Sequence, residues 1–133
     1  MNFLQRISIA LALLMTVAAP ASLANEALDA EVKAVYDSKL KELFLYFQQN
    51  PELSTMEHKT SARLADERTA LGYTVHRNVG GTGIVALLEN GKGPLVMFRA
   101  DMDGLPVEEK SGLAYASRAK QVDPNGNEVF VMH

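Results

Sequence analysis

In LVMFRADMDGLP, residues 95–106, an apolar run passes directly into two carboxylates. An unbroken apolar run of this length is typical of a strand that helices cover on both faces. Asp101 and Asp103 follow this predicted strand at its carboxyl end, where α/β sheets collect ligands and catalytic groups. Carboxylates at alternate positions of an extended chain point the same way, about 7 Å apart, and can bind a metal or orient a metal-bound imidazole. A turn rich in Asp, Gly and Pro is the alternative that the spacing leaves open.

Two helical patterns precede this stretch. Residues 25–49 carry apolar side chains at steps of three and four, which predicts an amphipathic helix that the following Asn-Pro pair ends. Ser54 and Glu57 have the spacing of a capping box and are expected to open a second helix. Gly72 is expected to close that helix in a left-handed conformation.

Short strand patterns complete the chain. Residues 73–77 alternate like a half-exposed strand, and residues 84–88 form an apolar run joined to residues 95–98 through an Asn-Gly turn, as a hairpin or as adjacent strands. Residues 122–132 predict a later hairpin around an Asp-Pro-Asn-Gly turn. The glycine-rich VGGTG at 79–83 lacks the Lys-Ser/Thr and the helix of a phosphate-binding loop, so it is predicted to be a turn. Helices followed by sheet strands predict an α/β or α+β layered domain.

The first 24 residues have the layout of a secretory signal peptide. A short start with one basic residue, Arg6, leads into an apolar run, and small residues precede a predicted cleavage between Ala24 and Asn25. The run is shorter than the ~20 residues that a membrane-spanning helix needs, which favours cleavage over an anchor. The sequence therefore predicts an exported protein, periplasmic or secreted, whose mature domain is residues 25–133.

Composition excludes several classes of protein. The chain has 133 residues, of which 47% are hydrophobic and 22% charged, with a net charge of −3, so neither a disordered chain nor a nucleic-acid-binding surface is expected. The absence of cysteine excludes disulfide scaffolds and thiolate metal ligands within these residues. The three histidines, His58, His76 and His133, are scattered and complete no metal shell by their spacing.

Three blocks occur in an order and spacing that resemble one family: NPELS at 50–54, VGGTG at 79–83 and RADMDGLPVEEK at 99–110. The blocks SGLAYAS at 111–117 and VMH at 131–133 extend the match. The chain is similar in these blocks to the amidohydrolase/metallocarboxypeptidase family, which includes hippurate hydrolases, N-acyl-amino-acid amidohydrolases and auxin-conjugate hydrolases. The block from Arg99 to Pro106 is the most specific of them.

The resemblance implies the N-terminal part of a helix-flanked, mixed-sheet zinc-peptidase catalytic domain. It implies a hydrolase with two divalent metal ions (zinc, or manganese or cobalt) that cleaves the amide bond of an N-acyl amino acid or a small peptide. One metal would polarise the carbonyl, both would activate a bridging water, and a glutamate would act as general base. Asp103 matches the family aspartate that lies beside the metals and orients a ligand, and Asp101 lines the site, so these two are the candidate catalytic residues. Gly104 stands where alanine is more usual.

The same resemblance predicts that the domain is incomplete. Family members continue after the Met-His pair with Ala-Cys-Gly-His-Asp, whose cysteine and histidine are the first metal ligands. The general base and a lid domain used for dimerisation come later in their sequences. His133 would then flank the metal loop without being a ligand, and residues 1–133 would bind no metal pair and hydrolyse nothing. The full-length form is expected to act on a small-molecule substrate as a homodimer, with no stable membrane span after signal cleavage. The alternative is a non-catalytic exported remnant or binding module from a truncated or frameshifted gene.

Overall fold

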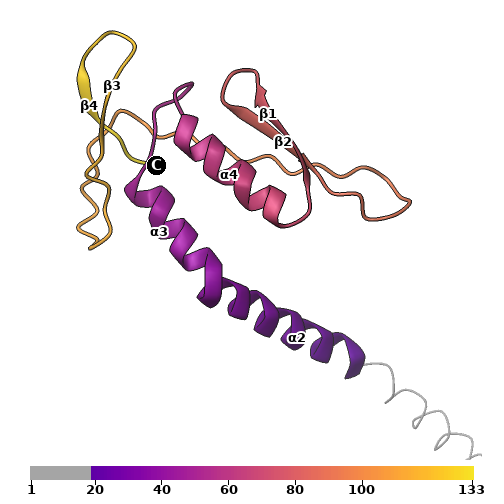
Figure 1. The fold of residues 1–133 in the computed structure, drawn as a ribbon. Helices are drawn as coiled ribbons and strands as arrows, with labels where there is room; N and C mark the ends of the chain where they lie inside the picture. Colours follow the sequence, from indigo (N-terminus) through magenta and orange to yellow (C-terminus); the bar gives the residue numbers. More distant parts are fainter. Residues whose placement is uncertain (1–18) are drawn as a thin grey trace, which may run out of the picture. The chain divides into compact units, whose positions relative to one another are not determined.

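The computed structural model describes residues 19–133, with helices in the first part of the chain and two pairs of short strands in the rest (Figure 1). The chain divides into two compact units, one that ends at Glu42 and one from Leu43 to His133. Most of the predicted signal peptide lies outside the described residues, so that peptide stays a prediction.

The first unit is helical throughout its described residues. α2 (Ala19–Val35) passes into a π-helical turn, η1 (Tyr36–Leu40), and then into α3 (Lys41–Gln49), which continues into the second unit. The predicted helix over residues 25–49 is confirmed. Its end at Asn50 is confirmed as well, because the proline that follows disfavours helical geometry in the residue before it.

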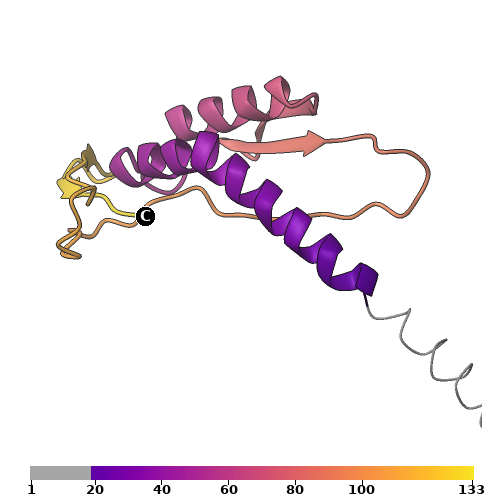
Figure 2. The ribbon, with the colours of Figure 1, turned by 90° about the horizontal axis from the view of Figure 1, so that it is seen from below.

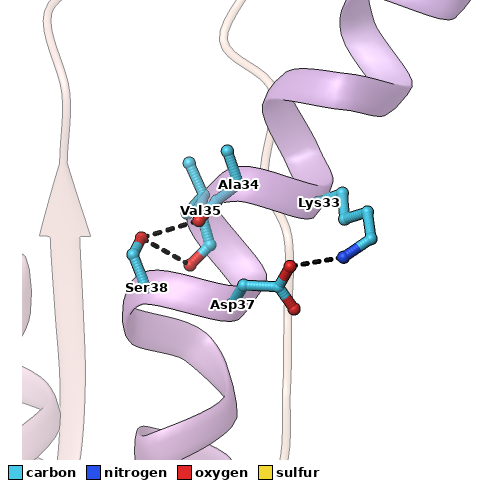
Figure 3. Close-up of polar contacts among 5 residues, drawn as sticks. All are labelled: Lys33, Ala34, Val35, Asp37 and Ser38. Carbon is cyan, nitrogen blue, oxygen red and sulfur yellow. Dashed lines mark hydrogen bonds and ion pairs between the residues drawn. The ribbon is translucent and has the colours of Figure 1, made fainter.

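Ser38 lies within the π-helical turn and bonds to the backbone of the turn before it. Its Oγ donates to the carbonyl oxygens of Ala34 at 2.7 Å and Val35 at 3.4 Å, and an ion pair joins Lys33 to Asp37 nearby (Figure 3). A hydroxyl that bonds to these carbonyls competes with the backbone amides for them. In the π turn the backbone hydrogen bonds span one residue more than in an α-helix. Apolar periodicity does not register such an insertion, so the sequence predicted an uninterrupted helix.

The predicted second helix is confirmed as α4 (His58–Ala70), but its predicted start is wrong. Its N-cap is Glu57 rather than Ser54, and the N-cap side chain makes no capping hydrogen bond. The carboxylate of Glu52 instead accepts the amides of Lys59 and Thr60 in the first turn. The N-cap therefore lies three residues after the position that the capping box predicted, and Glu52 rather than Ser54 satisfies amides of the first turn.

The end of α4 agrees with the prediction. Gly72 has φ of +85°, its amide bonds to the Thr69 carbonyl, and the Tyr73 amide bonds to the Arg68 carbonyl. These two bonds make a Schellman motif, in which the left-handed position favours glycine.

β1 (Thr74–Val79) and β2 (Gly83–Leu87) form an antiparallel hairpin, and α4 lies along it (Figure 2). The glycine-rich segment between them is the predicted turn, with Gly80 and Gly81 both at positive φ. The register shifts between His76 and Val79, where Asn78 also has positive φ. This bulge tightens the connection between the two strands.

β3 (Lys120–Val122) and β4 (Glu128–Phe130) form the second antiparallel pair, which confirms the later hairpin. Asp123 organises the turn, since its Oδ1 accepts the amides of Asn125 at 2.9 Å and Asn127 at 2.8 Å. These bonds hold the pKa of Asp123 below its ordinary value, the Asn127 amide contributing most.

The predicted strand over residues 95–98 is wrong. None of these residues lies in a strand, and β2 pairs with β1 instead. Their side chains face solvent, with Leu95 89% exposed and Phe98 95% exposed. In both ribbon views the chain after β2 runs out as an extended loop and returns (Figures 1 and 2). A strand needs a hydrogen-bonding neighbour, and apolar composition alone does not supply one.

Helices and strands are therefore both present, as an α/β prediction requires. The sheets in the described part of the chain, however, are two separate antiparallel pairs rather than one mixed sheet. Among the residues whose burial the structure describes, the buried aliphatic side chains are few: Leu53, Ala65 and Val131. Two of them lie where segments distant in sequence meet, and this meeting point also holds the candidate site.

Candidate functional site

Three segments, residues 51–53, 103–105 and 131–133, meet at what we call the junction. Leu53 and Gly104 form a parallel bridge, and Leu105 and Met132 form an antiparallel one. The Gly104 amide donates to the Glu52 carbonyl at 2.6 Å. Leu105 and Met132 exchange two backbone hydrogen bonds, of 2.7 and 3.1 Å. The stretch that carries both candidate aspartates is thus hydrogen-bonded on one side to residues 52–53, which precede α4, and on the other side to Met132.

Gly104 is at the tightest point of the junction. A Cβ atom at this position would lie 2.7 Å from Cγ1 of Val131 and 3.0 Å from Cβ of Pro51. Such distances are shorter than van der Waals contact, so a side chain here would force the segments apart. Close packing therefore explains the glycine at this position, whereas the sequence pattern left a turn open as one of two alternatives.

The structure gives Asp101 and Asp103 different surroundings. Asp103 is half-buried, and its backbone carbonyl accepts a hydrogen bond from Nδ1 of His133 at 2.6 Å. Asp101 is exposed and pairs with Arg99 at 2.6 Å. Of the two candidate catalytic residues, Asp103 is the one that belongs to the junction. His133 belongs to the junction as well, through this hydrogen bond to the Asp103 carbonyl.

Glu52 was not singled out from the sequence, yet it organises two elements. Its Oε2 accepts the Thr60 amide at 2.7 Å and its Oε1 accepts the Lys59 amide at 3.2 Å, so it caps the N-terminus of α4. Its carbonyl accepts the Gly104 amide. A negative carboxylate is also favourable beside the positive end of the helix dipole. The only sequence signal for Glu52 is its place in the NPELS block, since its spacing predicts no role.

Glu57 is buried and connects the start of α4 to the glycine turn of the hairpin. Its Oε1 accepts the Thr55 amide at 2.9 Å and its Oε2 accepts the Thr82 hydroxyl at 2.5 Å. Burial by itself raises the pKa of Glu57, but the hydrogen bonds from Thr82 and the backbone outweigh it and hold the pKa below the ordinary value of 4.5. The carboxylate is therefore ionised and satisfied within the fold.

Glu109 is a second carboxylate that sequence reasoning missed. It accepts hydrogen bonds from Ser111 Oγ at 2.5 Å, the Ser117 amide at 2.5 Å and Gln48 Nε2 at 2.9 Å. The Ser111 hydroxyl is the main reason that the pKa of Glu109 lies below its ordinary value. Ser117, itself buried, donates its hydroxyl to the Val131 carbonyl at 2.7 Å. This chain of bonds supports the junction from the side of α3.

No metal-ligand set is present in the part of the chain that the structure describes. Within residues 19–133, no three side chains of His, Asp or Glu are grouped so that they could hold a metal ion. His58 lies at the start of α4 and His76 in β1, and both are exposed. Asp103 therefore forms no metal-ligand set with its described neighbours. Among these residues, likewise, no helix is long and apolar enough to cross a membrane.

Comparison with known proteins identifies hydrolases as relatives. The putative amidohydrolase YhaA of Bacillus subtilis is 39% identical over 85 residues, which is 63% of this chain and 22% of that protein. The hippurate hydrolase of Campylobacter jejuni is 37% identical over 75 residues, 56% of this chain and 20% of that protein. The N-acetyl-L-cysteine deacetylase of Bacillus subtilis is 37% identical over 78 residues, 58% of this chain and 19% of that protein.

These similarities confirm the resemblance to amidohydrolases that the sequence blocks predicted. No family model matches the chain. The chain spans about a fifth of the length of the relatives it matches.

Proposed function

We propose that this chain is part of a metal-dependent amidohydrolase that cleaves the amide bond of an N-acyl amino acid or a small peptide. The observation that carries the proposal is the similarity to proteins named for this chemistry, a hippurate hydrolase and an N-acetyl-L-cysteine deacetylase among them. Hippurate and N-acetyl-L-cysteine are both amino acids with an acylated nitrogen. An amide of that kind is the substrate class that the two names share.

The described residues contribute support to the proposed site. Asp103 is the group most suited to act in it, because its backbone is bonded on both sides and its side chain is only half-buried. Asp101, exposed and paired with Arg99, is assigned to the rim. The pair of divalent ions, zinc or manganese or cobalt, belongs to the proposal through the family resemblance. Residues 19–133 supply no ligand set for it.

The proposal extends to the whole protein in three further respects. The catalytic domain is of the helix-flanked zinc-peptidase type, a lid domain serves dimerisation, and the protein is exported to the periplasm or secreted. The first 24 residues support export by their signal-peptide layout. Because no group of metal ligands is present in residues 19–133, we also expect residues 25–133 alone to hydrolyse none of these substrates.

The test uses the purified full-length gene product with hippurate, N-acetyl amino acids and a dipeptide as substrates. We expect release of the free amino acid, its loss after treatment with a chelator, and its return on addition of zinc, manganese or cobalt. Residues 25–133, purified in the same way, are the matched control and are expected to be inactive. Hydrolysis that persists in the chelated protein after complete removal of metal would contradict the proposal, as would no hydrolysis of any of the three substrate types.

A further inference from the structure

A single peptide unit at the centre of the junction is held at both of its polar atoms. The peptide bond between Asp103 and Gly104 offers one acceptor, the Asp103 carbonyl, and one donor, the Gly104 amide. The donor bonds to the Glu52 carbonyl at 2.6 Å, and the acceptor bonds to Nδ1 of His133 at 2.6 Å. In a trans peptide these two atoms point in opposite directions, so the two bonds fix the plane from its two edges.

One of these two bonds comes from a side chain. The Glu52 carbonyl belongs to the backbone and persists whatever residue stands at 52, whereas the bond to Asp103 depends on the imidazole of His133. A carbonyl oxygen can only accept, so the proton must be on Nδ1 of His133. The hydrogen bond therefore defines the tautomer of the neutral ring, with Nε2 as its acceptor.

The plane of this peptide sets the backbone on which the Asp103 carboxylate stands. Val131 and Pro51 lie close to Gly104 and leave no room for it to move toward them. At the residue after Gly104, the bridge between Leu105 and Met132 holds residues 103–105 and 131–133 in register. His133 completes this arrangement at the one atom of the peptide that the backbone leaves unbonded, the Asp103 carbonyl.

We propose that His133 is a positioning residue for Asp103: its Nδ1–H fixes the 103–104 peptide and so the direction of the Asp103 carboxylate. The inference rests on the proposed function, in which Asp103 acts beside the reacting groups. If His133 only flanked the site, replacing it would leave the direction of the Asp103 carboxylate unchanged.

The test compares His133→Asn and His133→Leu in the full-length gene product. The amide nitrogen of asparagine takes the place of Nδ1 as a donor, whereas leucine fills similar volume and donates nothing. We expect His133→Leu to lower kcat for hippurate by about 10- to 100-fold, the range seen when groups that orient a site residue are removed, with KM changed by less than about twofold. His133→Asn should recover most of kcat. His76→Leu, which removes an exposed histidine elsewhere, is the matched control and should leave kcat unchanged.

Two structural measurements accompany the kinetics. Nitrogen NMR of the wild-type protein should show His133 protonated at Nδ1, and exchange of the Gly104 amide should be faster in His133→Leu than in wild type or His133→Asn. Unchanged kcat in His133→Leu, an Nε2–H tautomer, or equal losses in the two variants would overturn the inference. If wild type hydrolyses nothing, the proposed function fails, and the tautomer and the Gly104 exchange still decide whether His133 holds this peptide.

Discussion

The junction and the apolar segment of residues 95–98 lie in the same unit and are joined by only a few residues, yet they differ in almost every contact. At the junction Leu53 is 5% exposed and Val131 1% exposed, whereas in the segment Met97 is 84% exposed and Phe98 95% exposed. The segment is the more apolar of the two. Hydrophobicity therefore does not decide which of them is buried.

The two regions differ in backbone hydrogen bonding and in how closely their side chains can pack. Residues at the junction exchange hydrogen bonds across three segments and pack on a glycine that lets the chains approach closely. Within the described residues, the segment has neither a strand beside it nor a close packing partner. Apolar side chains are stabilised only when other groups remove them from water, and buried backbone requires its hydrogen bonds at the same time.

Gly104→Val gives the largest expected effect on this comparison. The new side chain would meet Val131 and Pro51 at distances shorter than contact, so we expect the free energy of unfolding to fall by about 1–3 kcal/mol. Urea unfolding followed by circular dichroism measures the change. Gly93→Val is the matched control, because nothing lies within 4 Å of a Cβ at Gly93. Equal losses in the two variants would mean that the junction is not close-packed.

Glu57→Gln is expected to lower the free energy of unfolding by about 1 kcal/mol. The amide has one acceptor oxygen for the two donors, Thr55 N–H and Thr82 O–H, and its NH₂ group faces one of them. The control is Glu108→Gln, whose carboxylate pairs with Lys110 at an exposed position and should contribute little. If Glu57→Gln lowers the free energy of unfolding no more than Glu108→Gln does, Glu57 does not stabilise the contact between α4 and the β1–β2 turn.

Acid is expected to lower the free energy of unfolding by protonating three hydrogen-bonded carboxylates, which lie near the junction and in or beside the turns of the two hairpins. The folded-state pKa values of Glu57, Glu109 and Asp123 lie below their ordinary values, so their stabilisation is present above about pH 5 and is lost as pH falls below it. Unfolding midpoints in urea measured at descending pH test this. The decline should be shallower in Glu57→Gln. Stability that is constant or rises as the pH falls would have the wrong sign.

Phe98→Ser gives the smallest expected effect on stability, because this side chain is already in water. We expect the free energy of unfolding to change by less than about 0.5 kcal/mol and binding of a hydrophobic dye to decrease. Val131→Ser, at a buried apolar position, is the contrasting variant and should destabilise clearly. A large loss in Phe98→Ser would show that the segment has a packing partner in solution.

Much of the local structure could be predicted from the sequence. Periodicity predicted the helices, and turn chemistry predicted Gly72, the glycine turn and the Asp123 turn, because these features depend on neighbours in sequence. The capping box was wrong because Glu52, which lies outside the Ser54–Glu57 spacing, satisfies amides of the first turn of α4. The strand at residues 95–98 was wrong because no strand pairs with it in the described residues. The roles of Glu52, Glu57 and Glu109 depend on contacts over distances that spacing does not report.

The candidate site could be located by sequence but not resolved. By spacing alone Asp101 and Asp103 are equivalent, since alternate positions look alike in a pattern, and only the family resemblance gave them different expected roles. The structure separates them, because Arg99 takes Asp101 while His133 and the junction hold Asp103.

The most direct test is kcat/KM for hippurate in the full-length gene product with Asp103→Asn and with Asp101→Asn. We expect a loss of at least about 100-fold for Asp103→Asn, since in the proposed function this carboxylate acts through its charge, and a much smaller loss for Asp101→Asn. Both variants should keep the wild-type unfolding midpoint. Activity in Asp103→Asn within a few-fold of wild type, or a larger loss from Asp101→Asn, would contradict this expectation.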